Sequence, residues 1–301
     1  MKYRVRHLTE YSYDSKVNSC YNRAHILPRD TLVQSVDTPR VLILPTPTSG
    51  SRRTDYFGNR VYHFSIQEPH TSLTIDVSTN ITVKPLGNNH GSQFDYGNTC
   101  EQVLQALNCK MPSIETIYAR EFLLNSPMVR MSQQLQYFAQ SCFNPQKPFL
   151  TAVMDLTHKI FTDFDFDATV TSISTPVDEV LAHKHGVCQD FAHLAIGCLR
   201  SLGYAARYIS GYLETLPPPG QQRLVGADAS HAWFSVYSPG EGWFEFDPTN
   251  DSVPTFQHIV TAWGRDYADV SPLRGVVFGG GRHQKLIVSV DVARLARQEE
   301  A

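Results

Sequence analysis

Polar and apolar residues alternate along the first 83 residues with the period of two that β-strands require. The segments that show it best are YRVRHLTEYSY, VLILP, VYHFSI and LTIDVSTNITV. Turn signals, such as those at residues 55–59, separate them. We therefore predict a β-rich N-terminal domain over residues 1–88. A polar stretch rich in Gly and Asn, at residues 86–100, predicts a linker or an exposed loop after it.

Farther along the chain, apolar residues recur at the three- and four-residue steps of amphipathic helices. These steps occur at residues 114–124 and 128–141 and again at about 149–160. The Ser-Pro pair at 126–127 predicts the cap and the first position of the second helix. The Thr-Pro pair at 175–176 predicts the start of a further, shorter helix.

The most regular helical pattern lies in HKHGVCQDFAHLAIGCLRSL, residues 183–202. Its apolar stripe consists of Phe191, Leu194, Ala195, Cys198 and Leu202. Asp190 suits the positive end of a helix and Gly203 is a typical stop signal, so we expect the helix to begin close to Cys188. The Cys188 thiol would then meet the unpaired N–H groups of the first turn. Because Cys198 lies on the stripe, we expect it to be a buried structural thiol.

Strand patterns return after this helix. They cover residues 205–214, 231–237 and 243–246, and a Ser-Pro-Gly turn joins the last two as a hairpin. The loop at 215–230 contains three consecutive prolines and is expected at the surface as a rim or lid. The Gly-Gly-Gly-Arg segment at 279–282 lacks the GK[ST] ending of a phosphate-binding loop and precedes a strand-like segment, which favours a hairpin turn.

Composition narrows the class of protein. With 301 residues and 42% hydrophobic content, the chain can bury a sizeable core in one large domain or two. Its 26 basic and 29 acidic residues include no long basic run, which argues against binding to nucleic acid or to a membrane surface. The first residues form no apolar signal core, so we expect a cytoplasmic location. The six cysteines have no compact spacing, which favours reduced thiols over disulfides.

Cys188, His231 and Asp247 can form one reactive centre. A helix dipole stabilises a thiolate by only ~0.3–1 kcal/mol, so a second positive charge is needed, and an imidazolium is the usual one. His231 opens one strand of the predicted hairpin and Asp247 closes the other, which brings them within range of a hydrogen bond. We predict a catalytic triad in which Cys188 attacks a carbonyl carbon, His231 transfers the proton and Asp247 orients the ring. The Cys188 N–H is the natural oxyanion donor.

Several segments resemble a known family. GVCQDFAHL, LGYAARYISGYLE, DASHAWFSVY and GWFEFDPTN are similar to the catalytic core of the transglutaminase-like superfamily. HLTEYSYDS, ILPR, DYFGN and VYHFSIQEPH resemble the N-terminal domain of bacterial transglutaminase-like proteins.

The resemblance implies an α+β fold whose papain-like core, at about residues 148–250, lies within a second part that spans residues 89–301. It also implies acyl transfer from a carboxamide or peptide bond of a peptide or protein, through a thioester on Cys188, by hydrolysis or transamidation. The calcium dependence of some family members finds no clear ligand loop in this sequence, so we expect neither a metal nor a cofactor.

Two other classes of protein stay open at this point. Candidate zinc ligands are His183, His185, Cys188 and His193. Against them, His193 lies about 140° around a helix from Cys188. The chain could also be an inactive scaffold that binds a partner, although an intact triad argues against this. The three aspartates between 163 and 167 lack the glycine and glutamate of a calcium-binding helix-loop-helix.

Overall fold

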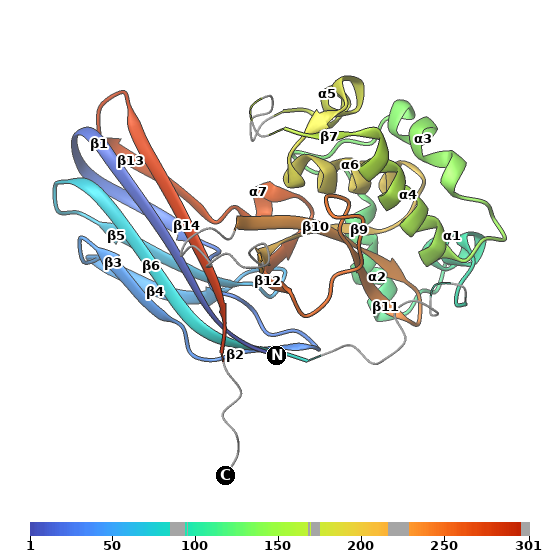
Figure 1. Cartoon of the computed structure of the whole chain (residues 1–301), viewed down its shortest axis with the longest axis horizontal. Helices are drawn as coiled ribbons and strands as arrows, with labels where there is room; N and C mark the ends of the chain where they lie inside the picture. The colour runs from blue at the N-terminus through green and yellow to red at the C-terminus, as the bar shows by residue number, and fades with distance from the viewer. Residues whose placement is uncertain (85–93, 95, 168, 170–174, 216–228, 296–301) are drawn as a thin grey trace, which may run out of the picture.

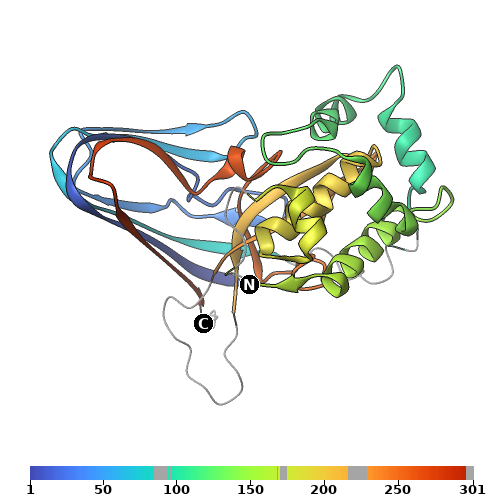
Figure 2. The same ribbon diagram turned by 90° about the horizontal axis from the view of Figure 1, so that it is seen from above.

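The structure, a computed structural model, describes residues 1–84, 94, 96–167, 169, 175–215 and 229–295. A large antiparallel sheet forms one side of the molecule and a helical part forms the other (Figure 1). Seen from above, the long strands extend away from the helices (Figure 2). The predicted α+β fold is confirmed, with its β-rich region first in the chain.

The large sheet has eight strands within the described residues. They are β1 (Lys2–Ala24), β2 (Gln34–Val36), β3 (Arg40–Leu44), β4 (Ser49–Thr54), β5 (Arg60–Ile66), β6 (His70–Val83), β13 (Leu273–Gly279) and β14 (Gln284–Arg294). Every second side chain along most of β6 is buried, as the period-two pattern predicts. Buried side chains of β1, β5 and β6, such as Cys20, Phe64 and Ile75, form the apolar core of this domain.

The last two strands, β13 and β14, return to the first sheet. Both pair antiparallel with β1: Tyr3 lies opposite Arg294 of β14, and Val17 lies opposite Gly279 of β13. The sequence pattern grouped them with residues 89–301, because alternation identifies a strand but not the strand with which it pairs. The N-terminal domain is therefore completed by the C-terminal strands. The glycines at 279–281 lie at the turn between β13 and β14, as expected.

The helical part contains seven α-helices in the described residues. They are α1 (Cys100–Leu107), α2 (Ile114–Arg120), α3 (Gln133–Ala139), α4 (Phe149–Asp163), α5 (Val177–His183), α6 (Cys188–Ser201) and α7 (Tyr267–Val270). Two 3-10 turns, η1 (Glu121–Leu123) and η2 (Gln140–Cys142), extend α2 and α3, and β7 (Asp165–Phe166) pairs with β8 (His185–Gly186). The described helices include none with the length and apolar character to cross a bilayer.

The start of α3 differs from the prediction. The predicted helix at 128–141 begins only at Gln133, where the Ser132 side chain accepts a hydrogen bond from the N–H of Leu135. The expected cap, Ser126, instead accepts a hydrogen bond from the buried guanidinium of Arg200. That tertiary contact holds Ser126 outside the helix, whereas both serines carry the same local capping signal.

The predicted linker at 86–100 and loop at 215–230 lie largely outside the described residues. At the end of the linker, α1 was not predicted. Its start carries a reciprocal capping box between Thr99 and Gln102, a short signal in a polar context that the linker composition obscured.

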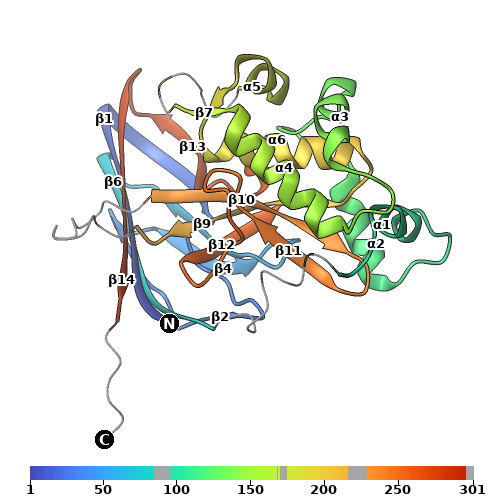
Figure 3. The same cartoon turned by 45° about the vertical axis from the view of Figure 1, so that its right-hand side comes forward.

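The helical part is built on a four-stranded sheet in the order β11-β10-β9-β12. Its strands are β9 (Ala206–Leu213), β10 (Ala229–Ser238), β11 (Gly242–Phe246) and β12 (His258–Gly264). α6 packs on β9 and β10 on the helical side, and the long strands of the N-terminal domain lie on the other side (Figure 3). The predicted hairpin of β10 and β11 is confirmed, with Ser238 opposite Gly242.

Stacked cations and aromatic rings join the N-terminal domain to this sheet. The guanidinium carbon of Arg29 lies 3.2 Å from the ring centre of Trp263, and that of Arg207 lies 3.9 Å from the same ring. Arg207 also lies 4.2 Å from the ring centre of Trp243. Cation–π contacts of this kind are strongest when buried, so they hold the two parts in register.

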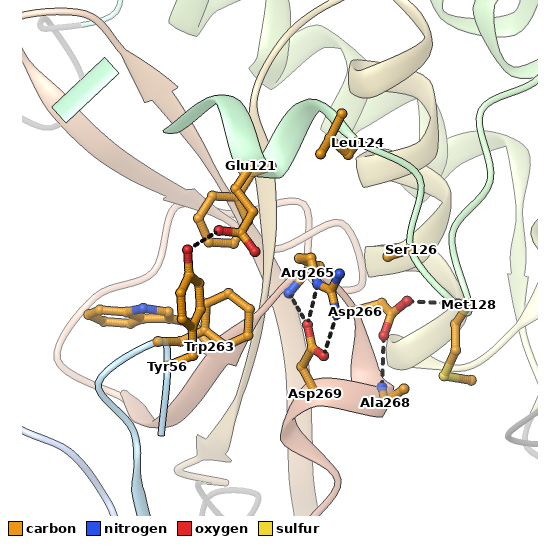
Figure 4. A network of polar contacts seen from close by, with 12 residues as sticks. Tyr56, Glu121, Leu124, Ser126, Met128, Trp263, Arg265, Asp266, Ala268 and Asp269 are labelled. Atoms are coloured by element: carbon orange, nitrogen blue, oxygen red, sulfur yellow. Dashed lines mark hydrogen bonds and ion pairs between the residues drawn. The ribbon is translucent and has the colours of Figure 1, made fainter. Parts of the chain in front are cut away.

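Polar contacts close the same junction (Figure 4). Tyr56 donates a 2.6 Å hydrogen bond to Glu121 in η1. Asp266, just after β12, accepts hydrogen bonds from the backbone N–H of Met128 at 2.7 Å and of Ala268 at 2.9 Å. The first bond ties a loop of the N-terminal domain to η1, and the bonds of Asp266 tie the loop before α3 and the start of α7 to the end of β12.

A buried arginine anchors the end of α6 farthest from Cys188. The side chain of Arg200 is 2% exposed. It donates hydrogen bonds to four backbone carbonyls and one hydroxyl, those of Phe122, Leu124, Ala206, Arg265 and Ser126. Because the acceptors belong to η1 and its following loop, to β9 and to the segment after β12, Arg200 fixes α6 relative to all three.

We expect Arg200→Leu to lower the free energy of unfolding by about 3–5 kcal/mol, because it leaves several buried acceptors without a donor. The matched control is Lys159→Ala, which removes a partly exposed ion pair to Asp163 within α4 and should cost about 0.3–0.5 kcal/mol. Urea unfolding measures both. An Arg200→Leu protein as stable as the control would contradict this account of α6.

Candidate active site

The predicted nucleophile lies at the first residue of α6. Cys188 is partly buried there. Asp190 accepts a 2.9 Å hydrogen bond from the N–H of Val187 and so closes the turn that leads into the helix. Gly186 is required in this turn, because a Cβ at this position would lie 2.9 Å from the Cβ of Asp190. The sequence Gly-Val-Cys-Gln-Asp therefore fixes where α6 begins, and with it the place of the sulfur atom.

His231 interacts with both of the other predicted triad residues. Its Nε2 lies 2.7 Å from Asp247 Oδ2, and Cys188 is close enough to help raise the pKa of its imidazole. His231 lies near the start of β10 and Asp247 directly follows β11, so their hairpin places them at the same end. His231 is 8% exposed and Asp247 is fully buried. The structure thus brings together the three residues that the sequence singled out.

The surroundings of His231 and Asp247 favour a protonated imidazole and an ionised carboxylate. Burial by itself lowers the pKa of His231, but hydrogen bonds to Asp247 and Cys188 outweigh burial and raise that pKa from 6.5 to about 10. Burial by itself raises the pKa of Asp247, but hydrogen bonds from His231 and His258 hold it well below the usual range. A protonated imidazole beside an ionised carboxylate follows, and imidazolium is the charge that stabilises a thiolate.

Asp247 accepts more hydrogen bonds than a triad requires. Its Oδ2 also accepts from Asn250 Nδ2 at 2.7 Å and from His258 Nε2 at 3.0 Å. Its Oδ1 accepts from the backbone N–H of Thr249 at 3.0 Å. His258 was missed by the sequence reading, which did not include β12. A signal was present, because HIVTAW repeats the pattern of His231, a histidine that opens an apolar strand.

A tryptophan and a glutamate support the two histidines. Trp233 lies 5.9 Å from His231 and 5.2 Å from His258, measured between ring centres. The indole N–H donates a 2.7 Å hydrogen bond to Glu245, whose pKa is raised by burial. Trp233 is fully buried, and its indole packs against both imidazoles.

One group of possible metal ligands gathers within the described residues: His231, Asp247 and His258, whose ligand atoms lie within 4.8 Å of one another. The 2.7 Å and 3.0 Å distances to Asp247 are those of hydrogen bonds. Among the described residues, the buried His258 Nδ1 has no hydrogen-bond partner, whereas a metal-bound imidazole ordinarily donates from its other nitrogen. The set therefore fits a proton-holding network better than a metal centre.

The zinc ligands that the sequence suggested do not form a cluster in the described part of the chain. His193 Nε2 instead accepts a 3.1 Å hydrogen bond from the N–H of Tyr267 and packs against Tyr208. The aspartates between 163 and 167 are likewise absent from the ligand groups that the described residues form.

Two family descriptions match the sequence. Residues 3–82 match the bacterial transglutaminase-like N-terminal region, and residues 136–248 match the transglutaminase-like superfamily. The second match includes Cys188, His231 and Asp247. The first covers β1 to β6, apart from the outermost residues of β1 and β6.

Relatives agree with these matches. An uncharacterized protein of Mycobacterium tuberculosis (strain ATCC 25618 / H37Rv) is 40% identical over 296 residues, which cover 97% of this chain and 92% of that protein. A protein-glutamine gamma-glutamyltransferase of Pseudomonas aeruginosa is 28% identical over 116 residues, 38% of this chain and 17% of that protein. The crystal structure of a proposed cysteine protease from Cytophaga hutchinsonii has the same fold, with a TM-score of 0.74 at 21% identity over 98% of this chain and 92% of that chain. The chain belongs to the transglutaminase-like superfamily, as a member with the bacterial transglutaminase-like N-terminal region.

Proposed function

We propose that this protein is a thiol-dependent acyl-transfer enzyme that acts on a carboxamide or peptide bond of a peptide or protein. The observation that carries the proposal is the hydrogen-bonded pair of His231 and Asp247 with Cys188, the first residue of α6, close enough to raise the pKa of His231. The superfamily match over the same residues supports the same class of chemistry.

In the first half of the proposed reaction, the Cys188 thiolate attacks the carbonyl carbon and forms a C–S bond. The His231 imidazolium then gives its proton to the leaving nitrogen as the C–N bond breaks. An acyl thioester on Cys188 and a free amine or ammonia result. Asp247 forms no bond to substrate; it keeps the imidazole oriented through Nε2, which leaves Nδ1 for the thiol.

In the second half, neutral His231 takes a proton from water or from a primary amine as that nucleophile attacks the thioester. The C–S bond breaks and the thiolate–imidazolium pair is restored. Water gives hydrolysis and an amine gives transamidation. The N–H of Cys188 belongs to the first turn of α6, where helix N–H groups have no acceptor within the helix, so we assign it to the developing oxyanion.

The competing proposal is an inactive scaffold that binds a partner in its cleft. Asp247 is a fully buried carboxylate that accepts hydrogen bonds from three side chains. Burying a charge in this way costs free energy, and a surface that only binds a partner does not need it. An assembled nucleophile, base and carboxylate favours the enzyme, because each keeps the partner that its chemical step needs.

We expect Cys188→Ala to abolish turnover and leave the fold unchanged, because the thioester cannot form. Incubation with glutamine-containing peptides, with and without a primary amine, followed by mass spectrometry identifies the product and any covalent adduct on Cys188. Cys109→Ala is the matched control: Cys109 is exposed and free but lies outside the candidate site. Turnover that persists in Cys188→Ala would end the proposal.

Asp247→Ala should lower kcat less than Cys188→Ala does, because Asp247 orients the base without touching the reacting atoms. We expect the kcat that remains in Asp247→Ala to exceed that in Cys188→Ala by a factor on the order of 10–100. Steady-state kinetics on the substrate found by the trapping experiment give the comparison. Equal losses in both variants, with the Asp247→Ala protein folded, would show that Asp247 takes part more directly than proposed.

The stability of the protein should depend on pH through His231. A histidine whose pKa is raised on folding gives its full stabilisation below its unfolded pKa of about 6.5 and loses it as the pH rises through its folded value of about 10. Wild type should therefore lose stability across that window, by at most about 1.4 kcal/mol per pH unit. Asp247 remains ionised throughout, because its pKa is lowered.

Urea unfolding between pH 6 and pH 10 measures this slope, and His231→Gln, which cannot titrate, is the reference. The difference in stability between the two proteins should shrink as the pH rises. Parallel curves would mean that the pKa of His231 is not raised in the folded protein.

A further inference from the structure

A second histidine, His258, bonds the same carboxylate oxygen of Asp247 as His231 does. It is the first residue of β12, which pairs with β9, so a rigid strand positions it. Its Nε2 lies 3.0 Å from Asp247 Oδ2, and its side chain is 7% exposed. The three strands β10, β11 and β12 thus each bring one member of the His231–Asp247–His258 cluster to one point.

The hydrogen bond of His258 shows where one of its hydrogens lies. Asp247 is ionised and can only accept, so His258 Nε2 must carry the hydrogen that joins them. Among the described residues, the buried Nδ1 of His258 has no hydrogen-bond partner. The Nε2–H is therefore the group through which His258 acts on its surroundings.

The charged groups around His258 are few and come from the two neighbouring elements. His231 and Asp247 face it directly, and Glu245 of β11 interacts with it electrostatically. Trp233 lies against the imidazole at 78°, edge to face. This packing leaves one orientation for the ring, in which Nε2 points at the carboxylate.

We propose that His258 is a positioning residue: its Nε2–H fixes the Asp247 carboxylate in the orientation that keeps imidazolium on His231. The inference rests on the proposed function for its catalytic meaning, but its physical content concerns only the cluster. Oδ2 accepts three hydrogen bonds, from His231, Asn250 and His258. Without His258, the carboxylate can turn away from His231 and the thiolate loses part of its counter-charge.

The rate at which iodoacetamide alkylates Cys188, measured against pH and read by peptide mass spectrometry, tests this without any substrate. In His258→Leu the pH of half-maximal alkylation should rise by about one unit, the effect of one hydrogen bond to a charged group. In His258→Gln the pH of half-maximal alkylation should stay close to the wild-type value, because the amide nitrogen can occupy the place of Nε2. Circular dichroism and thermal unfolding verify that each variant is folded.

His25→Leu is the matched control. His25 is also buried and also bonds a carboxylate, Asp55, at 3.2 Å, but in the N-terminal domain. It should leave the alkylation curve of Cys188 unchanged. If His258→Leu leaves that curve in place, or moves it to lower pH because the carboxylate only gains charge, the positioning role is wrong. A shift of the same size in His258→Gln would also overturn it, since the donor is retained there.

Amide turnover tests the proposed function, and the alkylation of Cys188 tests the role of His258 separately. If wild type turns over no amide, the proposed function fails, while the shift between variants still reports on His258. If wild type is active, His258→Leu should lower kcat about 10–100-fold with KM nearly unchanged, the size usual for groups that orient a site residue. An effect on KM alone would contradict positioning.

Discussion

The buried carboxylate of Asp247 is the constraint on which the candidate site depends. An ionised group with no exposure is stable only if its oxygens are fully hydrogen-bonded. Three side chains and one backbone N–H meet that need, and they come from β10, from β12 and from the turn after β11. The same bonds that make Asp247 tolerable therefore also fix the relative positions of these strands. Structure and candidate chemistry share one set of interactions, because the proton that His231 holds is what compensates the carboxylate.

The face of the four-stranded sheet that is turned away from α6 shows why the N-terminal domain accompanies the core. Trp233, Ile209 and Val260 form a small buried cluster on that face, and Trp263 packs against it. Arg29 of the first domain covers Trp263. Without the N-terminal domain, the helical part would expose these aromatic and apolar groups next to the His231 cluster, and water would weaken its hydrogen bonds. The return of β13 and β14 to β1 makes the association harder to undo, because the chain passes through the helical part between two segments of one sheet.

The sequence was informative wherever local pattern and tertiary role coincide. The sequence predicted the start of α6 and the β10–β11 hairpin, because each has a clear local signal for a helix start or a turn. These two elements carry Cys188, His231 and Asp247, which were predicted with them. Ser126 misled the prediction, since its best partner is the guanidinium of Arg200, which lies 74 residues away. His258 was missed for a related reason. The sequence around a histidine at the start of a strand does not show which carboxylate the histidine will contact. Only the strand order of the folded sheet brings Asp247 next to His258.

The cluster also bears on the choice between acid–base chemistry and metal binding. A metal ion held by His231, Asp247 and His258 would use the lone pair of each Nε2 and would need both nitrogens without hydrogen. His231 could then no longer receive and return a proton while Asp247 orients it, and the raised pKa of His231 would have no basis. Conversely, each hydrogen bond now present requires a hydrogen on Nε2. The cluster can therefore bind a metal ion or transfer a proton, but not both. The short distances from both imidazoles to Asp247 favour proton transfer.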